Sequence, residues 1–133
     1  MRGDADVLLD DIALYLQQQG VGVIGTDIFK GQMPAAPDNC IALFEYAGEP
    51  PDLHWPGEYP SLQAMVRNKS YAAGREKIEQ IKDALHGLSE TVINGHRYLL
   101  IQARQSPFFL ERDENARAIF VCNFRVMKAK EVE

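Results

Sequence analysis

The side chains of this chain best suited to acid–base chemistry or metal binding are its three histidines, His54, His86 and His96. A histidine exchanges protons near neutral pH and is a common metal ligand, but either role needs a second reactive group close by. The three lie in different expected elements, namely a loop, a helix end and a hairpin, and none has a nucleophile or metal partner at a recognisable spacing. We therefore interpret all three as surface histidines.

Two pairs of adjacent carboxylates, Asp10–Asp11 and Asp113–Glu114, could in principle act as a general acid and a general base. Side chains that are neighbours in sequence rarely converge on one reacting bond, and solvation is the simpler explanation of both pairs. The carboxylates therefore predict no active site.

Glycines and cysteines are equally uninformative about chemistry. Gly20, Gly22 and Gly25 lie between an expected helix and a weak strand, which is the wrong order for a dinucleotide-binding fingerprint. Cys40 and Cys122 each lie inside an apolar run without a second ligand at metal-binding spacing, which predicts buried free thiols in preference to a disulfide. We therefore expect no enzyme, no cofactor and no metal.

Composition limits the class of protein further. The 133 residues suit one domain, and 46% hydrophobic with 25% charged residues is typical of a globular chain. No apolar run reaches the roughly 20 residues of a membrane helix, and the first residues lack a signal-peptide pattern, so we expect a soluble cytoplasmic product without a membrane partner. The net charge of -5 works against general binding to nucleic acid, because phosphate neutralisation drives such binding.

Two amphipathic helices are expected to support whatever the chain does. Apolar residues recur at steps of three and four over Leu8–Leu16, and Gly20 can end that helix. Ser70–Leu88 is the stronger helix, with an apolar stripe that must meet a sheet and Gly87 as its terminator. Gly74 inside it costs about 1 kcal/mol relative to alanine, which indicates a close backbone approach.

Strands account for most of the remaining chain, and their apolar patterns predict an antiparallel sheet. The Asn94-Gly95 pair tolerates the positive φ of a tight turn and indicates a hairpin. Frayed ends are expected at about 1–5 and 128–133. The expected strands are Cys40–Tyr46, Leu62–Val66, Thr91–Ile93, Arg97–Ala103 and Ala118–Met127, with weaker extended pieces at Val21–Ile24 and Asp27–Gln32.

Two long connections are the expected contact surfaces. Ala47–Pro60 is rich in proline and glycine, so we expect neither helix nor inner strand there. Trp55 in this connection either covers the sheet edge or anchors in a neighbouring subunit, and both interpretations remain open. Glu58 in the same connection is a further candidate contact residue.

The second connection, Gln105–Arg117, is polar and turn-rich. Its mixture of guanidinium and carboxylate groups suits reciprocal contacts between identical subunits, because arginine can fix register through bidentate pairs. A solvated loop whose ion pairs contribute under about 1 kcal/mol explains the same residues equally well. The candidate contact residues in this connection are Arg112, Asp113, Glu114 and Arg117.

The order of elements predicts a single α+β domain over residues 1–133, with a mainly antiparallel, mixed sheet packed by two helices. The run Pro107–Asn115, followed by Ile119–Phe124 and preceded far upstream by Pro37–Tyr46, resembles the minor capsid or tail terminator proteins of long-tailed bacteriophages. The resemblance extends from about Leu8 to Val126. It implies a sheet flanked by helices, in copies that stand side by side as a ring.

The first functional hypothesis is therefore a structural phage or prophage protein that caps the tail tube, ends tail polymerisation and joins head to tail. The resemblance implies a ring of probably six copies in the virion, assembled in the bacterial cytoplasm. Its partners would be the tail tube protein and a head-completion or connector protein, and DNA would pass through without specific binding. The alternatives are a small α+β ligand-binding or regulatory module and, with no residues to support it, a small hydrolase.

Overall fold

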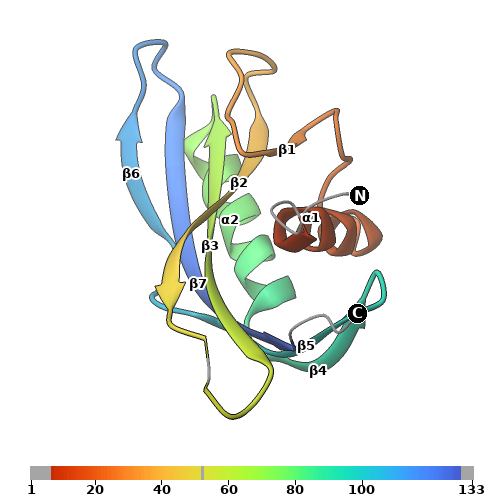
Figure 1. Cartoon of the computed structure of the whole chain (residues 1–133). Helices are drawn as coiled ribbons and strands as arrows, with labels where there is room; N and C mark the ends of the chain where they lie inside the picture. Colours follow the sequence, from red (N-terminus) through yellow and green to blue (C-terminus); the bar gives the residue numbers. More distant parts are fainter. Residues whose placement is uncertain (1–6, 52, 130–133) are drawn as a thin grey trace.

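The computed structural model describes residues 7–51 and 53–129, and these form an α+β domain in which two helices pack on one curled sheet (Figure 1). The sheet is seven-stranded, in the order β1-β2-β3-β7-β5-β4, with β6 paired to β7. Only β1 and β2 pair in parallel, so the mainly antiparallel, mixed sheet is confirmed. The strands are β1 (Ile28–Lys30), β2 (Cys40–Glu49), β3 (Gly57–Asn68), β4 (Leu88–Ile93), β5 (His96–Ala103), β6 (Phe108–Arg112) and β7 (Ala118–Ala129).

Helix α1 (Val7–Gln18) forms where the apolar spacing predicts it, and Gly20 follows with a φ of 77°. Val21–Ile24 is not a strand and contributes a single bridge at Ile24, whereas β1 lies inside the expected Asp27–Gln32. Of the expected frayed ends at about 1–5 and 128–133, residues 1–5 and 130–133 lie outside the described residues. For residues 128–129 the expectation was wrong, because β7 continues two residues past Met127.

Helix α2 (Tyr71–Leu85) covers the middle of the sheet with a buried stripe that includes Ile78 and Ile81. Ser70 caps its start by accepting a hydrogen bond from the Ala73 backbone N–H at 3.2 Å. The expected end at Leu88 is wrong, because the backbone turns at Gly87 with a φ of 88° and Leu88 opens β4.

Gly74 confirms the expected close approach on this stripe. A Cβ at Gly74 would lie 2.7 Å from Cε1 of Phe120 and 3.1 Å from Cβ of Asn68. Phe120 belongs to β7 at the centre of the sheet and is fully buried. The helix therefore sits closer to the sheet than any side chain at position 74 would permit without movement.

The β4–β5 hairpin forms as predicted, with positive φ at Asn94 (52°) and Gly95 (80°). The expectation for the next stretch was wrong: Ala47–Pro60 is not one long loop. β2 continues to Glu49, and β3 begins at Gly57, so the connection comprises only residues 50–56. β3 is an inner strand, because it pairs with β2 on one edge and with β7 on the other.

Two local features allow a proline in this inner strand. The β2–β3 register shifts between Tyr46 and Glu49, and Pro60 is not a partner in either ladder that flanks it. At the shift the backbones nearly touch, since a Cβ on Gly48 would lie 1.8 Å from the carbonyl oxygen of Tyr59. Glycine at position 48 is therefore what lets both strands continue.

The expectation that Gln105–Arg117 is an irregular polar connection was also wrong. Phe108–Arg112 forms β6, which pairs with the first half of β7 and leaves only a short turn at 113–117. The second half of the same edge of β7 pairs with β5, so β5 and β6 follow one another along β7.

Asp11 and His96 are the remaining corrections. Asp11 is fully buried, not solvated, and accepts a hydrogen bond from the Tyr98 hydroxyl at 2.5 Å. Nδ1 of His96 lies 2.8 Å from the same oxygen, Oδ2 of Asp11, and only 15% of the His96 side chain is exposed. These contacts tie α1 to the β4–β5 hairpin; the prediction of surface histidines holds for His54 and His86 alone.

Both cysteines are buried free thiols, as expected. Burial, the largest effect, raises the pKa of Cys122 to about 11 and also raises the pKa of Cys40 above its ordinary value. No helix among the described residues has both the length and the apolar character to cross a membrane.

Candidate assembly surface

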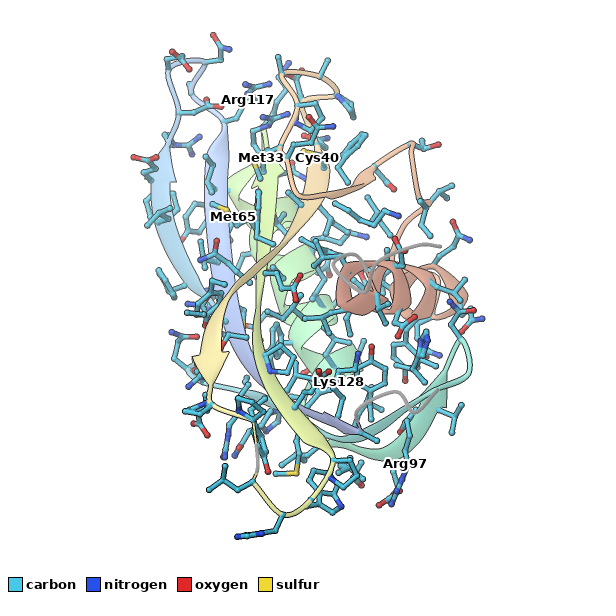
Figure 2. The ribbon with its side chains drawn as sticks, viewed as in Figure 1. Met33, Cys40, Met65, Arg97, Arg117 and Lys128 are labelled. Atoms are coloured by element: carbon cyan, nitrogen blue, oxygen red, sulfur yellow. The ribbon has the colours of Figure 1, made fainter. Side chains whose placement is uncertain are left out.

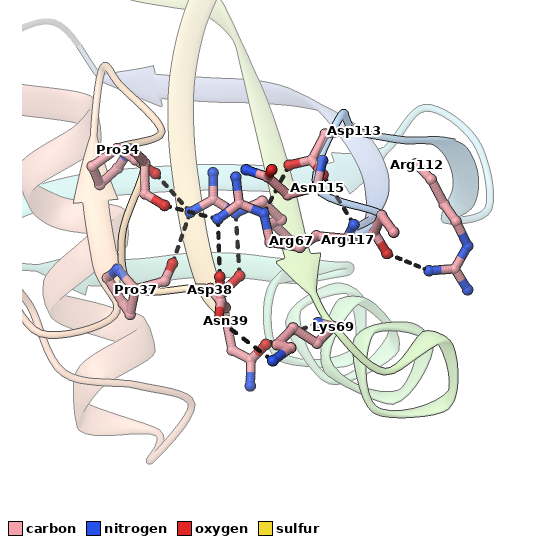
Figure 3. A network of polar contacts seen from close by, with 12 residues as sticks. Pro34, Pro37, Asp38, Asn39, Arg67, Lys69, Arg112, Asp113, Asn115 and Arg117 are labelled. Atoms are coloured by element: carbon pink, nitrogen blue, oxygen red, sulfur yellow. Dashed lines mark hydrogen bonds and ion pairs between the residues drawn. The ribbon is translucent and has the colours of Figure 1, made fainter.

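Two buried arginines organise one end of the molecule, where residues 31–39 lie beside the β6–β7 turn (Figure 3). Arg67 on β3 donates from Nη2 to the carbonyl oxygens of Pro34 at 2.6 Å and Pro37 at 2.7 Å, and from Nε to that of Asp38 at 3.1 Å. A buried guanidinium must find acceptors for its N–H groups, and here main-chain carbonyls supply them. Arg67 thus fixes a loop that contains no regular structure.

Arg117, the residue just before β7, completes this network. Its Nη1 donates to the Ala35 carbonyl oxygen at 2.7 Å and lies 3.1 Å from Oδ1 of Asp38, while its Nε donates to Oδ2 of Asp113 at 2.9 Å. Only 7% of the Arg117 side chain is exposed. Arg67 and Arg117 together, here called the arginine network, join the 31–39 loop to the β6–β7 turn.

Asp113 holds the turn from the inside. Its Oδ1 accepts hydrogen bonds from the backbone N–H groups of Asn115 at 3.0 Å and Arg117 at 2.9 Å. The Arg117 backbone N–H, above all, holds the pKa of Asp113 below its ordinary value; burial opposes this, and the Arg117 guanidinium adds to the lowering. Asp113 is therefore a carboxylate that stabilises the turn.

The remaining candidates in this turn point outward. Arg112 is exposed at the end of β6, and its Nη1 donates to the Ala116 carbonyl oxygen at 2.7 Å. Glu114 is exposed at the tip of the turn. The sequence-predicted cluster therefore divides into two internal residues, Asp113 and Arg117, and two that a partner could reach.

The other predicted segment, around Trp55, lies at the opposite end of the molecule. Figure 1 shows the β2–β3 connection at the bottom and the β6–β7 turn at the top. Trp55 is 36% exposed, and its ring packs over Gly57, where an added Cβ would lie 1.5 Å from Cζ3. Part of the ring thus covers the start of β3 while the rest faces solvent.

A pocket of about 320 Å³ opens beside this lower end, between the start of β3, the end of β2 and α1. Glu45, Glu49 and the half-buried Glu58 line it, together with Lys128. The Lys128 ammonium lies 5.6 Å from the centre of the Tyr98 ring, a cation–π contact, and Figure 2 shows it well away from Arg117 at the other end. Across residues 7–51 and 53–129, no three His, Cys, Asp or Glu side chains could share a metal ion.

Sequence reasoning missed one exposed surface. Phe108, Phe109 and Leu110 on β6 are 37%, 39% and 48% exposed, and Tyr71 at the start of α2 is 47% exposed. The Tyr71 and Phe109 rings lie 5.3 Å apart, so the patch is continuous. Three successive apolar residues after a proline could have indicated a strand, but the polar residues around them concealed it.

Comparison with known proteins identifies the class. The model of a family described as bacteriophage tail terminator protein matches residues 15–129. A chain from a structure titled virion of native gene transfer agent particle has the same fold, with a TM-score of 0.70, 15% identity, and coverage of 92% of this chain and 94% of that one. No curated protein matches.

The chain is thus a structural protein of bacteriophage tails. It belongs to the bacteriophage tail terminator family, which the resemblance in its sequence indicated.

Proposed function

We propose that this chain caps the tail tube as a ring, ends tube polymerisation and provides the surface to which the DNA-filled head is joined. Membership of the tail terminator family supports the first part of this proposal. The partners are other copies of the same chain, six in a closed ring, the tail tube protein, and a head-completion or connector protein. Assembly takes place in the cytoplasm of the bacterial host.

The observation that carries the proposal is that the molecule has two differently built ends. At one end the arginine network fixes the 31–39 loop and the β6–β7 turn; at the other, Trp55 and the β2–β3 connection are exposed. A terminator must bind tube on one side and head on the other, and these two partners differ. Two dissimilar ends satisfy that requirement.

The network also explains why one end can act as a binding surface. Ordering a loop on binding costs free energy, and a loop that is already ordered avoids this cost. Arg67 and Arg117 together donate to four carbonyl groups between Pro34 and Asp38. The candidate contacts are the exposed residues Trp55, Arg112 and Glu114 and the pocket residue Glu58, with Asp113 and Arg117 as the support of the turn.

The work of such a protein is binding and not turnover. DNA would pass the ring without specific recognition, because a chain with a net charge of -5 gains little from counterion release. The expected affinity for duplex DNA at physiological salt is therefore weak. Tight binding with a steep salt dependence, measured by titration at several salt concentrations, would contradict this.

Complementation of a phage that lacks the gene tests the proposal. The intact chain should restore tails of uniform length joined to heads, as counted in electron micrographs. Trp55→Ala and Arg112→Ala should fold normally, since exposed positions seldom affect stability much, yet give overlong or headless tails. Normal tails without the gene would refute the terminator function, and normal tails with both variants would refute the contact assignment alone.

A second candidate function, a small ligand-binding module, is favoured by one observation, the pocket lined by Glu45, Glu49, Glu58 and Lys128. Its mixed charges suit a compound that carries both a cation and a hydrogen-bond acceptor. A thermal-shift screen of zwitterionic and cationic small molecules tests it: a stabilisation that Glu58→Gln abolishes would support it, and no stabilisation would exclude it.

A further inference from the structure

Strand β6 has one edge with no partner among the described residues. It pairs with β7 through Phe108, Phe109, Glu111 and Arg112, and no strand in residues 7–51 or 53–129 pairs with its other edge. All five of its residues are exposed. An edge of this kind presents a row of backbone N–H and C=O groups that another extended segment can bind.

The side chains of β6 are as unusual as its edge. Successive residues of a strand point to opposite faces, so the run Phe108-Phe109-Leu110 makes both faces of β6 apolar at that point. Edge strands that must stay single commonly carry charges or proline along their length, whereas β6 has its two charges, Glu111 and Arg112, only at its end and a register shift after Phe109. We call Phe108, Phe109 and Leu110, together with Tyr71 of α2, the apolar edge of the molecule.

β6 is already held in position for binding. Nη1 of Arg75 on α2 donates to the carbonyl oxygen of Pro107 at 2.8 Å, just before the strand. The Phe109 ring packs 5.7 Å from that of buried Phe120, and Arg112 is tied to the turn that follows. Binding of a partner strand would therefore cost little free energy for ordering β6.

The same chain carries a second open edge of matching length. β1 pairs with β2 only as far as Leu43, so the outer edge of residues 44–49 has no strand beside it among the described residues. Residues 45–49 are exposed and begin and end with glutamates, Glu45 and Glu49. The three residues between them are uncharged, as are the first three of β6.

One antiparallel alignment faces opposite charges without facing like ones. With Arg112 of one copy opposite Glu45 of another, Leu110 lies opposite Ala47 and Phe109 opposite Gly48, while Phe108 lies opposite Glu49. Opposite charges on directly facing residues favour this register, and a shift by one residue would lose the match.

We infer that β6 of one copy binds the outer edge of residues 44–49 of a second copy, so that the sheet continues from subunit to subunit. The inference deepens the proposed function and rests on the ring. The two edges belong to different parts of the chain, so the contact is heterologous and can repeat around a ring.

A disulfide experiment tests the register in assembled tails. The double variant Leu110→Cys/Ala47→Cys replaces the natural chain in cells that produce the phage, and the tails are oxidised and run on a non-reducing gel. Facing residues of an antiparallel pair lie about 4.5 to 5.5 Å apart at Cα, within the range that a disulfide spans. The natural cysteines are buried and should stay silent.

The expected result is a ladder of dimers and higher multimers, and none for the control Leu110→Cys/Val92→Cys, whose Val92 is exposed on β4. Tails that carry the chain at their ends but give no ladder, or an equal ladder with the control, would overturn the strand pairing and leave the terminator function standing. Tails that lack the chain at their ends, seen by immunogold labelling, would overturn both.

A charge in the apolar edge gives a second test. Leu110→Lys should keep its far-ultraviolet spectrum and melting curve, because position 110 is about half exposed. It should give at least tenfold fewer capped tails, whereas Val92→Lys should stay within twofold of the natural chain. Equal capping by the two folded variants would overturn the inference.

Discussion

Replacing Gly74 with alanine sets helix propensity against packing. In an exposed helix the change would stabilise by about 1 kcal/mol. Here the new Cβ would meet Cε1 of Phe120 at 2.7 Å, Cδ1 at 3.0 Å and Cβ of Asn68 at 3.1 Å. Phe120 is fully buried on the central strand β7 and touches Tyr71 and Phe109, with ring centres 5.0 and 5.7 Å away, so it cannot swing aside alone.

Overpacking of a core by one methyl group costs roughly 1 to 3 kcal/mol. Subtracting the propensity gain leaves a net loss of about 1 kcal/mol for Gly74→Ala. Unfolding entropy is about 2.1 cal/mol/K per residue, so for a chain of 133 residues this loss lowers Tm by about 4 °C. Thermal melting followed by circular dichroism is sufficient to detect it.

The matched control lies on the same helix. Ala72 is exposed, so Ala72→Gly should lose up to about 1 kcal/mol through propensity alone. If the packing argument is right, both directions of exchange destabilise, Gly to Ala at position 74 and Ala to Gly at position 72. A rise in Tm for Gly74→Ala would refute the reasoning, because it would mean that Phe120 makes room at no cost.

Three further predictions address the core and the arginine network. Ile81→Ala should lower the free energy of unfolding by about 2 to 5 kcal/mol through a cavity under α2, measured by urea denaturation; an unchanged midpoint would mean that α2 is not packed as described. Arg67→Met should release three main-chain carbonyls and make residues 34–38 the first site of limited proteolysis; an unchanged cleavage pattern would contradict its role. The pKa of Asp113 is lowered on folding, so its contribution is present above its unfolded pKa near 3.9 and is lost as pH falls through the folded value. Melting from pH 7 to pH 2.5 should therefore show the natural chain more stable than Asp113→Asn at neutral pH and the difference vanishing in acid; a constant difference would exclude this linkage.

Local signals made part of this fold predictable from sequence. The Asn94-Gly95 turn, the serine cap of α2 and the apolar stripe beneath it are decided within a few residues, and each forms where expected. Gly74 was informative for the same reason, since glycine inside a strong helix needs a cause. These signals were sufficient for the fold class.

The errors occurred where distant residues decide the structure. Pro60 argues against an inner strand unless one knows that the β2–β3 register shifts beside it and that Gly48 lets the backbones approach. β6 exists because β7 extends far enough to pair with β5 and β6 along one edge. Neither pairing can be recognised from the residues of β3 or β6 alone.

The candidate site was predicted as a cluster but not as a division of roles. Arg112, Asp113, Glu114 and Arg117 are indeed close in space, as neighbours in sequence must be. Arg117 is buried because Ala35 and Asp38, about eighty residues earlier, provide its acceptors. No local pattern distinguishes Arg117 from exposed Arg112. The sequence therefore could not show which arginine supports the turn and which is available to contact a partner.

The apolar edge connects these observations with the logic of assembly. A heterologous contact either closes into a ring or continues as a filament, and the rotation between subunits decides which. On an open chain of subunits one β6 would always remain exposed and ready to bind further copies, whereas closure pairs every β6 and leaves none. An unpaired edge that binds further copies is therefore compatible with the proposed role of stopping growth only if the assembly closes. The register shift in β6 twists the strand locally, and it is the feature of this edge best placed to set the rotation between subunits.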